Sequence, residues 1–292
     1  MAIITKEHIA ASFRVGNGVE LPQPPNGIAR MHADLTLLGD VLSAKPVEAG
    51  FAWTDKTTVR RPTRHSAWFL GGKNGAFVED PKLLDATDGN KAAGRRGLEL
   101  LLNFSAEQYE ALHNLKCLAD VGIRLGALAV GIPLEVFTQG HTRYRVAHYV
   151  GAEGGGIGVH VDGNLITALL TNGPGLTELR YDGSRHCTDH RATSLMPGST
   201  LYRASAAAGQ PFLPTFHYVD MPPGTNKTSF VAAYNLPEGS YDLYGHPFNY
   251  DVASMKAGDN PHDGPLVPLW QQAANAHGVS VEDFSHSRFP AA

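Results

Sequence analysis

Apolar residues recur every three or four positions between Ser105 and Val130, which is the spacing of one face of a helix. Ser105 and Gln108 form a Ser-x-x-Gln capping box at the start, and Gly131 and Pro133 follow the repeat. The recurring apolar residues are Tyr109, Leu112, Leu115, Leu118, Val121, Leu125 and Leu128. The pattern predicts a long helix over this segment, with the apolar stripe packed against the rest of the protein.

From about residue 142 the apolar period shortens to two, which is the period of a half-buried strand. Residues 143–150 show it most clearly, because Tyr144, Val146 and His148 alternate with a second set of side chains. Further strands are predicted over residues 165–170, 176–181, 192–195, 200–204, 215–219 and 228–234. Many short strands separated by turn residues favour a sandwich or barrel. The predicted fold class is therefore mainly β with flanking helices.

The other segments are less regular. Residues 21–27 contain three prolines and are predicted to be neither helix nor central strand. Residues 57–65 form a basic cluster, either a solvated edge or a place where an arginine binds a substrate carboxylate. Residues 71–97 are rich in Gly, Asn, Asp and Lys and are predicted to be loop. Residues 267–276 have the pattern of an amphipathic helix.

Composition narrows the class of partner. A net charge of −4 and an isoelectric point near 6.4 give no reason to expect a nucleic acid or a membrane as partner. The two cysteines do not make a disulfide framework, and no apolar run is long enough for a membrane-spanning helix. The first residues lack the charged-then-apolar order of a signal peptide. The expected localisation is cytoplasmic.

The candidate chemistry lies in the triplet His160-Val161-Asp162 and in His217, which follows His160 by 57 residues. His160 and Asp162 stand two positions apart, so on an extended strand both side chains leave the same face. Two histidines and one carboxylate on one face of an octahedron leave three positions open, as in non-haem Fe(II) oxygenases. Metal ligands on neighbouring strands favour a jelly-roll among the β architectures.

The triplet alone is a weak signal, because the chain contains a second one at His32-Ala33-Asp34. A cation and a hydroxyl, Lys227 and Ser229, follow His217 at ten and twelve positions, and this combination sets His160 apart. The segment around His32 is predicted to be an N-terminal turn. His186 and His190 follow a turn signal and are predicted to lie at a surface hairpin end rather than on the metal.

These motifs resemble the isopenicillin N synthase-like branch of the Fe(II)/2-oxoglutarate-dependent dioxygenases over residues 105–236. That family's core has H-x-D, a T-x-L-type strand, a distal histidine and R-x-S about ten residues later. This chain has His160-Val161-Asp162, the strand 165–170, His217 and Lys227-Thr228-Ser229 in that order. The family also has a long support helix before its barrel, which agrees with the helix predicted above.

The resemblance implies that His160, Asp162 and His217 bind Fe(II), and that 2-oxoglutarate chelates the metal. Lys227 and Ser229, with Tyr149, would hold the far carboxylate of 2-oxoglutarate. The chain departs from the family at Lys227, where the family has Arg, and around Tyr149, where the family's Asn and Pro are missing. Lysine supplies a charge and three donors but lacks the planar fork of arginine.

The implied reaction uses O2 to oxidise a C–H bond of a small molecule, by hydroxylation, desaturation or cyclisation, and releases succinate and CO2. The retained carboxylate of Asp162 argues against halogenation. An amino-acid-derived or secondary-metabolite substrate, and so a role in natural-product biosynthesis, is the family-level expectation. Candidate residues for substrate contact are Trp68, Phe69, Arg143 and Arg145.

Two alternatives stay open at this point. The first is a 2-oxoglutarate-independent Fe(II) oxidase of the same family, which the lysine at position 227 favours. The second is a metal-binding jelly-roll isomerase or binding protein without O2 chemistry. A purely structural domain would leave the joint pattern of ligands, cation and hydroxyl unexplained.

The expected organisation is a single domain over residues 1–292 with a double-stranded β-helix (jelly-roll) core. Its parts are an N-terminal lead-in with loops (1–104), the support helix (105–130), the catalytic core (142–236) and a C-terminal segment (237–292).

Overall fold

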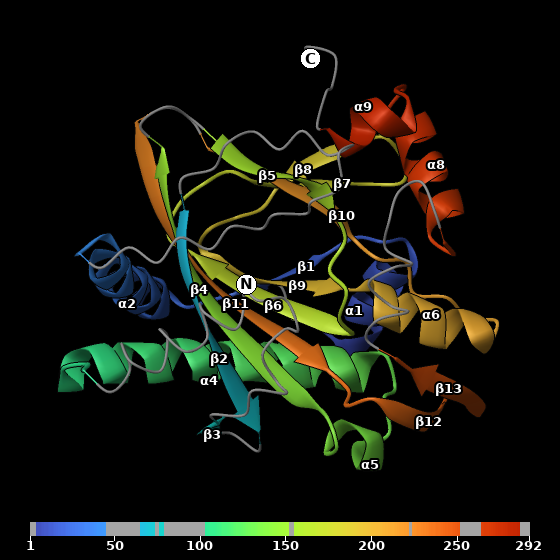
Figure 1. The fold of residues 1–292 in the computed structure, drawn as a ribbon, viewed down its shortest axis with the longest axis horizontal. Helices are drawn as coiled ribbons and strands as arrows, with labels where there is room; N and C mark the ends of the chain where they lie inside the picture. The colour runs from blue at the N-terminus through green and yellow to red at the C-terminus, as the bar shows by residue number, and fades with distance from the viewer. Residues whose placement is uncertain are drawn as a thin grey trace.

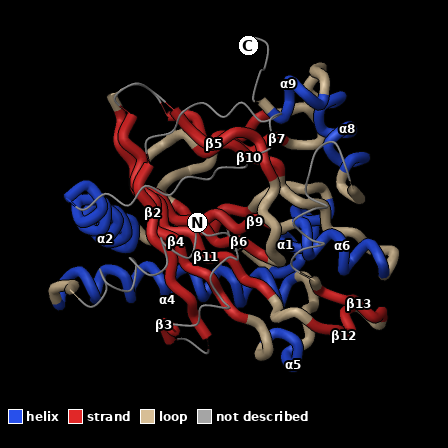
Figure 2. The backbone as a smooth tube through the Cα atoms, viewed as in Figure 1, coloured by secondary structure: helices blue, strands red, loops and turns tan. Residues whose placement is uncertain are grey.

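The structure is a computed structural model that describes residues 4–44, 65–73, 76–78, 103–151, 155–221, 224–251 and 264–286. Within these ranges two antiparallel sheets lie one above the other, and helices flank them (Figure 1). Colouring by secondary structure places the strands centrally and the helices around them (Figure 2). The prediction of a mainly β chain with flanking helices is confirmed.

The larger sheet has seven strands in the order β1-β9-β6-β11-β4-β2-β3. Its strands are β1 (Val19–Pro22), β2 (His65–Lys73), β3 (Ala76–Val78), β4 (His141–Gly151), β6 (Ile166–Thr171), β9 (Ala192–Pro197) and β11 (Thr225–Asn235). The smaller sheet has the order β5-β10-β7-β8. Its strands are β5 (Gly155–His160), β7 (Leu176–Leu179), β8 (Arg185–Cys187) and β10 (Phe216–Met221). A separate hairpin joins β12 (Gly239–Leu243) to β13 (His246–Tyr250).

Most predicted strands are present, with two corrections. Residues 200–204 are not a strand, because they lie within helix α6 (Ser199–Ala207). The alternation of Thr200, Leu201 and Tyr202 imitates a strand, but the alanine-rich continuation favours a helix and Gly198 serves as its N-cap. The predicted loop over residues 71–97 is wrong at its start, where β2 continues to Lys73 and β3 follows. The rest of that segment, and residues 57–64, lie outside the described ranges.

The N-terminal segment is more regular than its sequence suggests. Helix α1 (Lys6–Arg14) is capped by the Thr5 side chain, and helix α2 (Pro25–Ala44) begins at a proline. Proline is tolerated in the first helical turn because its missing N–H would have no partner there. The exclusion of helix from residues 21–27 is therefore wrong from Pro25 onwards, although β1 does lie at a sheet edge as the prolines require. The triplet at His32 is helical and is not the predicted turn.

Helix α4 (Ala106–Ala129) confirms the long helix, including the capping box between Ser105 and Gln108. Its buried face differs from the predicted stripe, since Tyr109, Val121, Leu125 and Leu128 are exposed. The buried residues are Ala111, Leu112, Leu115, Lys116, Ala119, Gly122, Ile123, Gly126 and Ala127.

Small residues decide which face of α4 packs against the sheet. A Cβ placed on Gly122 would lie 2.7 Å from a Leu195 methyl carbon, closer than two carbons can approach. The glycine therefore lets the helix backbone lie directly against β9. Apolar periodicity misses such a contact, because it scores large side chains and ignores glycine.

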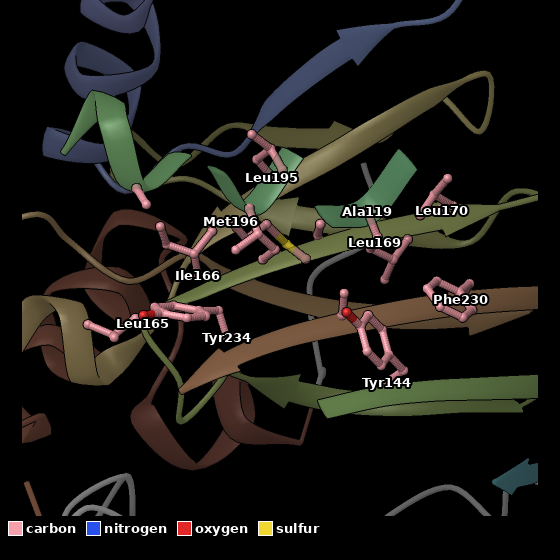
Figure 3. Packing of buried hydrophobic residues seen from close by; sticks show 14 of the residues in the cluster. Ala119, Tyr144, Leu165, Ile166, Leu169, Leu170, Leu195, Met196, Phe230 and Tyr234 are labelled. Atoms are coloured by element: carbon pink, nitrogen blue, oxygen red, sulfur yellow. The ribbon is translucent and has the colours of Figure 1, made fainter. Parts of the chain in front are cut away.

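The two sides of the larger sheet carry different side chains. Ile166, Ala168 and Leu170 of β6 share a side with Phe230 and Tyr234 of β11, as their register requires. These buried residues belong to the main hydrophobic core, and Figure 3 shows several of them beside α4, with Ala119 of the helix among them. The register of β4, β6 and β11 places the polar residues of the candidate site on the opposite side of the sheet.

A second apolar cluster supports the smaller sheet. Phe216 of β10 contacts Trp270 and Phe284 edge to face, with ring centroids 4.8 and 5.4 Å apart. Trp270 belongs to helix α8 (Val267–Ala276), which has the predicted bounds, and Phe284 belongs to α9 (Val281–Ser285). A further short helix, α5 (Leu134–Phe137), precedes β4. None of the helices in the described ranges has the length and apolarity needed to cross a membrane.

Candidate metal centre

Three predicted ligands meet at the end of the smaller sheet. His160 of β5 and His217 of β10 are direct cross-strand partners, and their ring centroids lie 4.2 Å apart. Asp162 follows β5, and its Oδ1 lies 3.9 Å from the Nε2 atom of each histidine. The three ligand atoms all lie within 4.8 Å of one another. Within the described ranges this is the one group of three or more such residues close enough to share an ion.

Local hydrogen bonds orient both imidazoles toward the same point. The Nδ1 atom of His160 lies 2.8 Å from the Gly158 carbonyl oxygen, and that of His217 lies 3.0 Å from the Thr215 carbonyl oxygen. A carbonyl can only accept, so each Nδ1 carries the proton and donates. In the neutral form of each ring Nε2 is then the unprotonated nitrogen and faces Asp162, which is the tautomer that binds a metal through Nε2.

The carboxylate is oriented in the same way. Thr167 Oγ1 lies 2.5 Å from Asp162 Oδ2 and accepts a hydrogen bond of 2.9 Å from the Asn164 side-chain amide. Because the hydroxyl oxygen accepts a hydrogen bond from Asn164, the hydroxyl donates its own proton to a hydrogen bond with Asp162. This hydrogen bond holds Oδ2 toward Thr167, and Oδ1 faces the two histidines. Sequence reasoning assigned Thr167 to a strand and missed this role.

The backbone around Asp162 is fixed from helix α6. The Ser199 amide donates to the Asp162 carbonyl at 2.8 Å, and the Thr200 hydroxyl donates to the Gly163 carbonyl at 2.9 Å. The segment wrongly predicted as a strand thus holds the loop that carries the ligand. A helix N-terminus has free amides for this purpose, whereas a strand at the same place would use them within a sheet.

The electrostatics favour an ionised carboxylate at Asp162. Burial opposes ionisation of Asp162, but His217, His160, the Thr167 hydroxyl and Arg145 outweigh it, so its pKa is lowered. The Asp162 side chain is 24% exposed and that of His160 is 34% exposed, so the ligand set is open to solvent on one side.

The donor set fits a divalent metal ion. Cis ligands of one octahedral ion with bonds of about 2.1 Å lie about 3 Å apart. The two separations of 3.9 Å between Asp162 and the histidines are therefore each a little under an ångström wider than in a metal-bound site.

Lys227 lies on β11 in a buried position, with 2% of its surface exposed. Its ammonium stands 5.2 Å from the Tyr149 ring centroid, and burial lowers its pKa to about 7. Gly173 makes room for it, because a Cβ on Gly173 would lie 2.9 Å from the Lys227 Cβ. Among the described side chains, Lys227 has the Tyr149 ring as partner and no carboxylate.

Register places Lys227 on the same side of the larger sheet as the ligands. Thr167, which bonds to Asp162, is the cross-strand partner of Ala233 on β11. Side chains at alternate positions of a strand share a side, so Ser229 and Lys227 share the side of Ala233. Tyr149 pairs with Lys227, and Thr171 pairs with Ser229 and accepts its hydroxyl bond at 3.3 Å. The predicted cation, hydroxyl and tyrosine therefore adjoin one another.

The remaining candidates fall into separate places. His186 bonds to Glu20 at 2.9 Å, and the His32 ring nitrogen bonds to the His190 carbonyl at 2.8 Å, so His32 and His186 make contacts outside the metal-ligand group. Arg143 and Arg145 lie on β4 at positions that are an even number of residues from Tyr149, so they are on the same side of the sheet as that tyrosine. Trp68 and Phe69 lie on β2, and their side chains are outside the described part of the structure.

No protein-family model matches the sequence, and no curated protein matches it. Solved structures do match. A full-length Neurospora crassa protein in complex with alpha-KG and thymine has a TM-score of 0.54 at 14% identity, over 86% of this chain and 90% of that chain. A putative 2OG-Fe(II) oxygenase family protein from Caulobacter crescentus gives 0.52 at 17%, over 86% and 92%. The rice dioxygenase for auxin oxidation gives 0.50 at 18%, over 78% and 77%. At such identities the likeness establishes that this chain shares the fold of these proteins.

Proposed function

We propose that this chain is a non-haem Fe(II)/2-oxoglutarate-dependent oxygenase of the isopenicillin N synthase-like branch. It would be a single domain over residues 1–292 with a double-stranded β-helix core. The proposal combines a metal-ligand group and a buried cation on one side of the larger sheet. The shared fold supports it, since the Neurospora crassa protein has the same fold and was solved with alpha-KG.

In this proposal His160, His217 and Asp162 hold the iron through the two Nε2 atoms and Oδ1. This ligand set leaves three positions for co-substrate and O2. With iron and 2-oxoglutarate bound, the centre would supply oxidation of a C–H bond of a small molecule, with release of succinate and CO2. The part of Thr167 is to keep the carboxylate oriented, and that of Gly158 and Thr215 is to keep both rings in the metal-binding tautomer.

The observation that carries the 2-oxoglutarate assignment is Lys227. A buried ammonium whose described partner is an aromatic ring is costly, because its hydration is lost and no opposite charge of the described residues replaces it. A dicarboxylate whose far end reaches Lys227 would remove that cost by a charge-assisted hydrogen bond. Ser229 adds a hydroxyl beside it, and Tyr149 forms the wall against which the ammonium packs.

The test is 2-oxoglutarate consumption and O2 uptake by the iron-loaded protein. We expect both to depend on added 2-oxoglutarate, and Asp162→Ala to abolish them while leaving the far-UV circular dichroism unchanged. Asp242→Ala is the matched control, because Asp242 is an exposed carboxylate on β12. Full O2 uptake without 2-oxoglutarate would favour the co-substrate-independent oxidase. Turnover without O2 would favour the isomerase.

A further inference from the structure

The chain bends at the end of strand β6, beside the contacts proposed for 2-oxoglutarate. Thr171 is the last residue of β6 that pairs with β11, and its partner is Ser229. Two residues later Gly173 lies so close to Lys227 that a Cβ on the glycine would be 2.9 Å from the lysine Cβ. Asn172 lies between these two contacts, within the bend. The bend therefore adjoins both side chains that would hold the far carboxylate.

At this bend the Asn172 side chain takes the place of a main-chain acceptor. The Asn172 backbone N–H donates to the Thr228 carbonyl at 3.2 Å, as in a regular antiparallel pair. The Thr228 N–H donates in return to Asn172 Oδ1 at 2.8 Å. In a regular pair both bonds would join main-chain atoms. The side-chain amide thus extends the pairing of β11 by one residue beyond the end of β6.

The orientation of this amide is fixed by its partners. A main-chain N–H can only donate, so Oδ1 is the atom at Thr228, and Nδ2 faces helix α2. Nδ2 donates to the Thr36 hydroxyl at 3.0 Å, and that hydroxyl donates to the His32 carbonyl at 2.8 Å. Each hydrogen bond in this series has one direction. Asn172 therefore joins β11 to α2 in a single arrangement.

Thr228 is also held by its own side chain. It is buried, and its Oγ1 lies 3.0 Å from His148 Nδ1 on the side of the sheet that faces α2 (Figure 1). Gly39 of α2 leaves room for this contact, because a Cβ on Gly39 would collide with Thr228 Oγ1. Neighbouring side chains leave opposite sides of a strand. A Thr228 held toward α2 therefore directs Lys227 and Ser229 to the metal side of the sheet.

We propose that Asn172 is a positioning residue for 2-oxoglutarate, because it fixes through Thr228 the ammonium and the hydroxyl that would bind the far carboxylate. This inference rests on the proposed function and adds to that site a residue that does not touch the co-substrate. A charge-assisted hydrogen bond needs its donor at a defined place, and supporting residues with fixed rotamers keep it there. Without the Asn172 side chain, the Thr228 N–H loses its acceptor in a buried position, and β11 can shift at the bend.

The experiment uses the Zn(II)-loaded protein, because zinc has no redox chemistry and nothing turns over. Calorimetric titration measures the affinity for 2-oxoglutarate, and competition with a chelator measures the affinity for Zn(II). The variants are Asn172→Ala, which removes the acceptor, and Asn172→Asp, which keeps an oxygen for the Thr228 N–H. Asn172→Ala is also combined with Lys227→Met. Asn249→Ala is the matched control, because Asn249 is exposed on β13 and its side chain bonds to Ser240 within that hairpin.

We expect Asn172→Ala to weaken 2-oxoglutarate binding about tenfold or more and Zn(II) binding less than about threefold. Asn172→Asp and Asn249→Ala should bind 2-oxoglutarate within about threefold of the wild type, because the acceptor at Thr228 is kept. In the Lys227→Met background, Asn172→Ala should have less than about a threefold further effect, because the ammonium that it positions is gone. A residue that only stabilises the fold would weaken both ligands, or would act equally in both backgrounds.

A measurement on the wild type tests the inference even if a variant does not fold. Hydrogen exchange followed by NMR reports how firmly each amide is held in the protein without 2-oxoglutarate. We expect the Thr228 amide to exchange as slowly, within about tenfold, as the amides of the regular ladder between β11 and β6. That result would show β11 pinned at Thr228 before the co-substrate binds.

Four results would overturn the inference. They are wild-type affinity of Asn172→Ala for 2-oxoglutarate, an equal loss of affinity for Zn(II), an equal effect of the change in the Lys227→Met background, and a fast-exchanging Thr228 amide in the wild type. An Asn172→Asp variant as weak as Asn172→Ala would overturn it too, since the acceptor would not be the cause. The proposed function stands in all these cases as long as the wild type binds 2-oxoglutarate. Failure of the wild type to bind it would instead remove the proposed function, and the inference with it.

Discussion

Replacing Lys227 by Met should stabilise the protein without its ligands and destroy its affinity for 2-oxoglutarate. Methionine has a similar length and packs well in apolar surroundings, so the change removes the charge with little change of shape. Lys227 is 2% exposed and its described partner is the Tyr149 ring. The substitution therefore separates two effects of the Lys227 ammonium. One is the free energy by which the buried charge destabilises the protein without ligands, and the other is its contribution to 2-oxoglutarate affinity.

The magnitude follows from the pKa of Lys227, which burial lowers from 10.5 to about 7. A tenfold change in an acid constant is worth about 1.4 kcal/mol, so the charged side chain costs the folded state on the order of 5 kcal/mol. The unfolded chain holds the proton up to a higher pH than the fold does. The penalty is therefore full below pH 7 and disappears as the pH rises from about 7 to 10.5. Loss of the contact with the Tyr149 ring offsets about 1 kcal/mol of the gain.

The assay is urea unfolding of the metal-free proteins at a series of pH values. At pH 6 we expect Lys227→Met to raise the free energy of unfolding by about 3 to 5 kcal/mol, and the difference to shrink by about 1.4 kcal/mol for each pH unit above 7. Lys6→Met is the control, since Lys6 is exposed at the start of α1 and should change stability by less than about 0.5 kcal/mol. In the iron-loaded protein the same Lys227→Met change should weaken 2-oxoglutarate binding at least about a hundredfold, because a buried charge loses its partner. A variant no more stable than wild type at pH 6, or a pH-independent difference, would refute the view that burial of the Lys227 cation destabilises the protein without its ligands.

Further predictions concern the same centre and the helix behind it. In wild type, 2-oxoglutarate affinity should fall about tenfold per pH unit above pH 7, because binding then requires protonation of Lys227. The affinity of Lys227→Arg should be insensitive to pH in this range, and calorimetric titrations in which both proteins lose affinity equally with pH would contradict this. Thr167→Val should weaken Fe(II) binding about 10- to 100-fold, because Asp162 Oδ2 loses its hydrogen bond. Unchanged Fe(II) affinity in a chelator competition would show that the Thr167 hydroxyl does not orient Asp162. Gly122→Leu should lower the free energy of unfolding by about 1–3 kcal/mol because the new side chain collides with Leu195, whereas Val121→Leu on the exposed face should change it very little. Similar urea midpoints for the two variants would argue against close packing of α4 on the sheet.

The candidate metal-ligand group could be predicted from the sequence because its signal is local or has a fixed offset. His160 and Asp162 stand two positions apart, although β5 ends at His160 and Asp162 lies just beyond the strand, and His217 is marked by the lysine and serine that follow it. The structure adds that cross-strand pairing of β5 with β10 brings both histidines together. Such pairing depends on register between distant segments, which no local pattern contains.

The support of the site was less predictable. Thr167 was assigned only to a strand, although its hydroxyl orients Asp162. Its role depends on the bend at residues 163–165, and the backbone there is held by amides of α6, a helix whose first residues imitate a strand. The buried face of α4 was also missed, since Gly122 contributes by the absence of a side chain. Apolar periodicity detects large residues and is blind to both kinds of contact.

The central claim is that His160, Asp162 and His217 bind iron beside a 2-oxoglutarate site anchored by Lys227. The most direct measurement is anaerobic absorption spectroscopy of the metal-free protein titrated with Fe(II) and then with 2-oxoglutarate. We expect the weak visible charge-transfer band of a chelated keto acid in the wild type, a weakened band in Lys227→Ala, and an unchanged band in the control Lys6→Ala. Iron binding without a band would contradict the 2-oxoglutarate site, and failure to bind Fe(II) would contradict the metal centre itself.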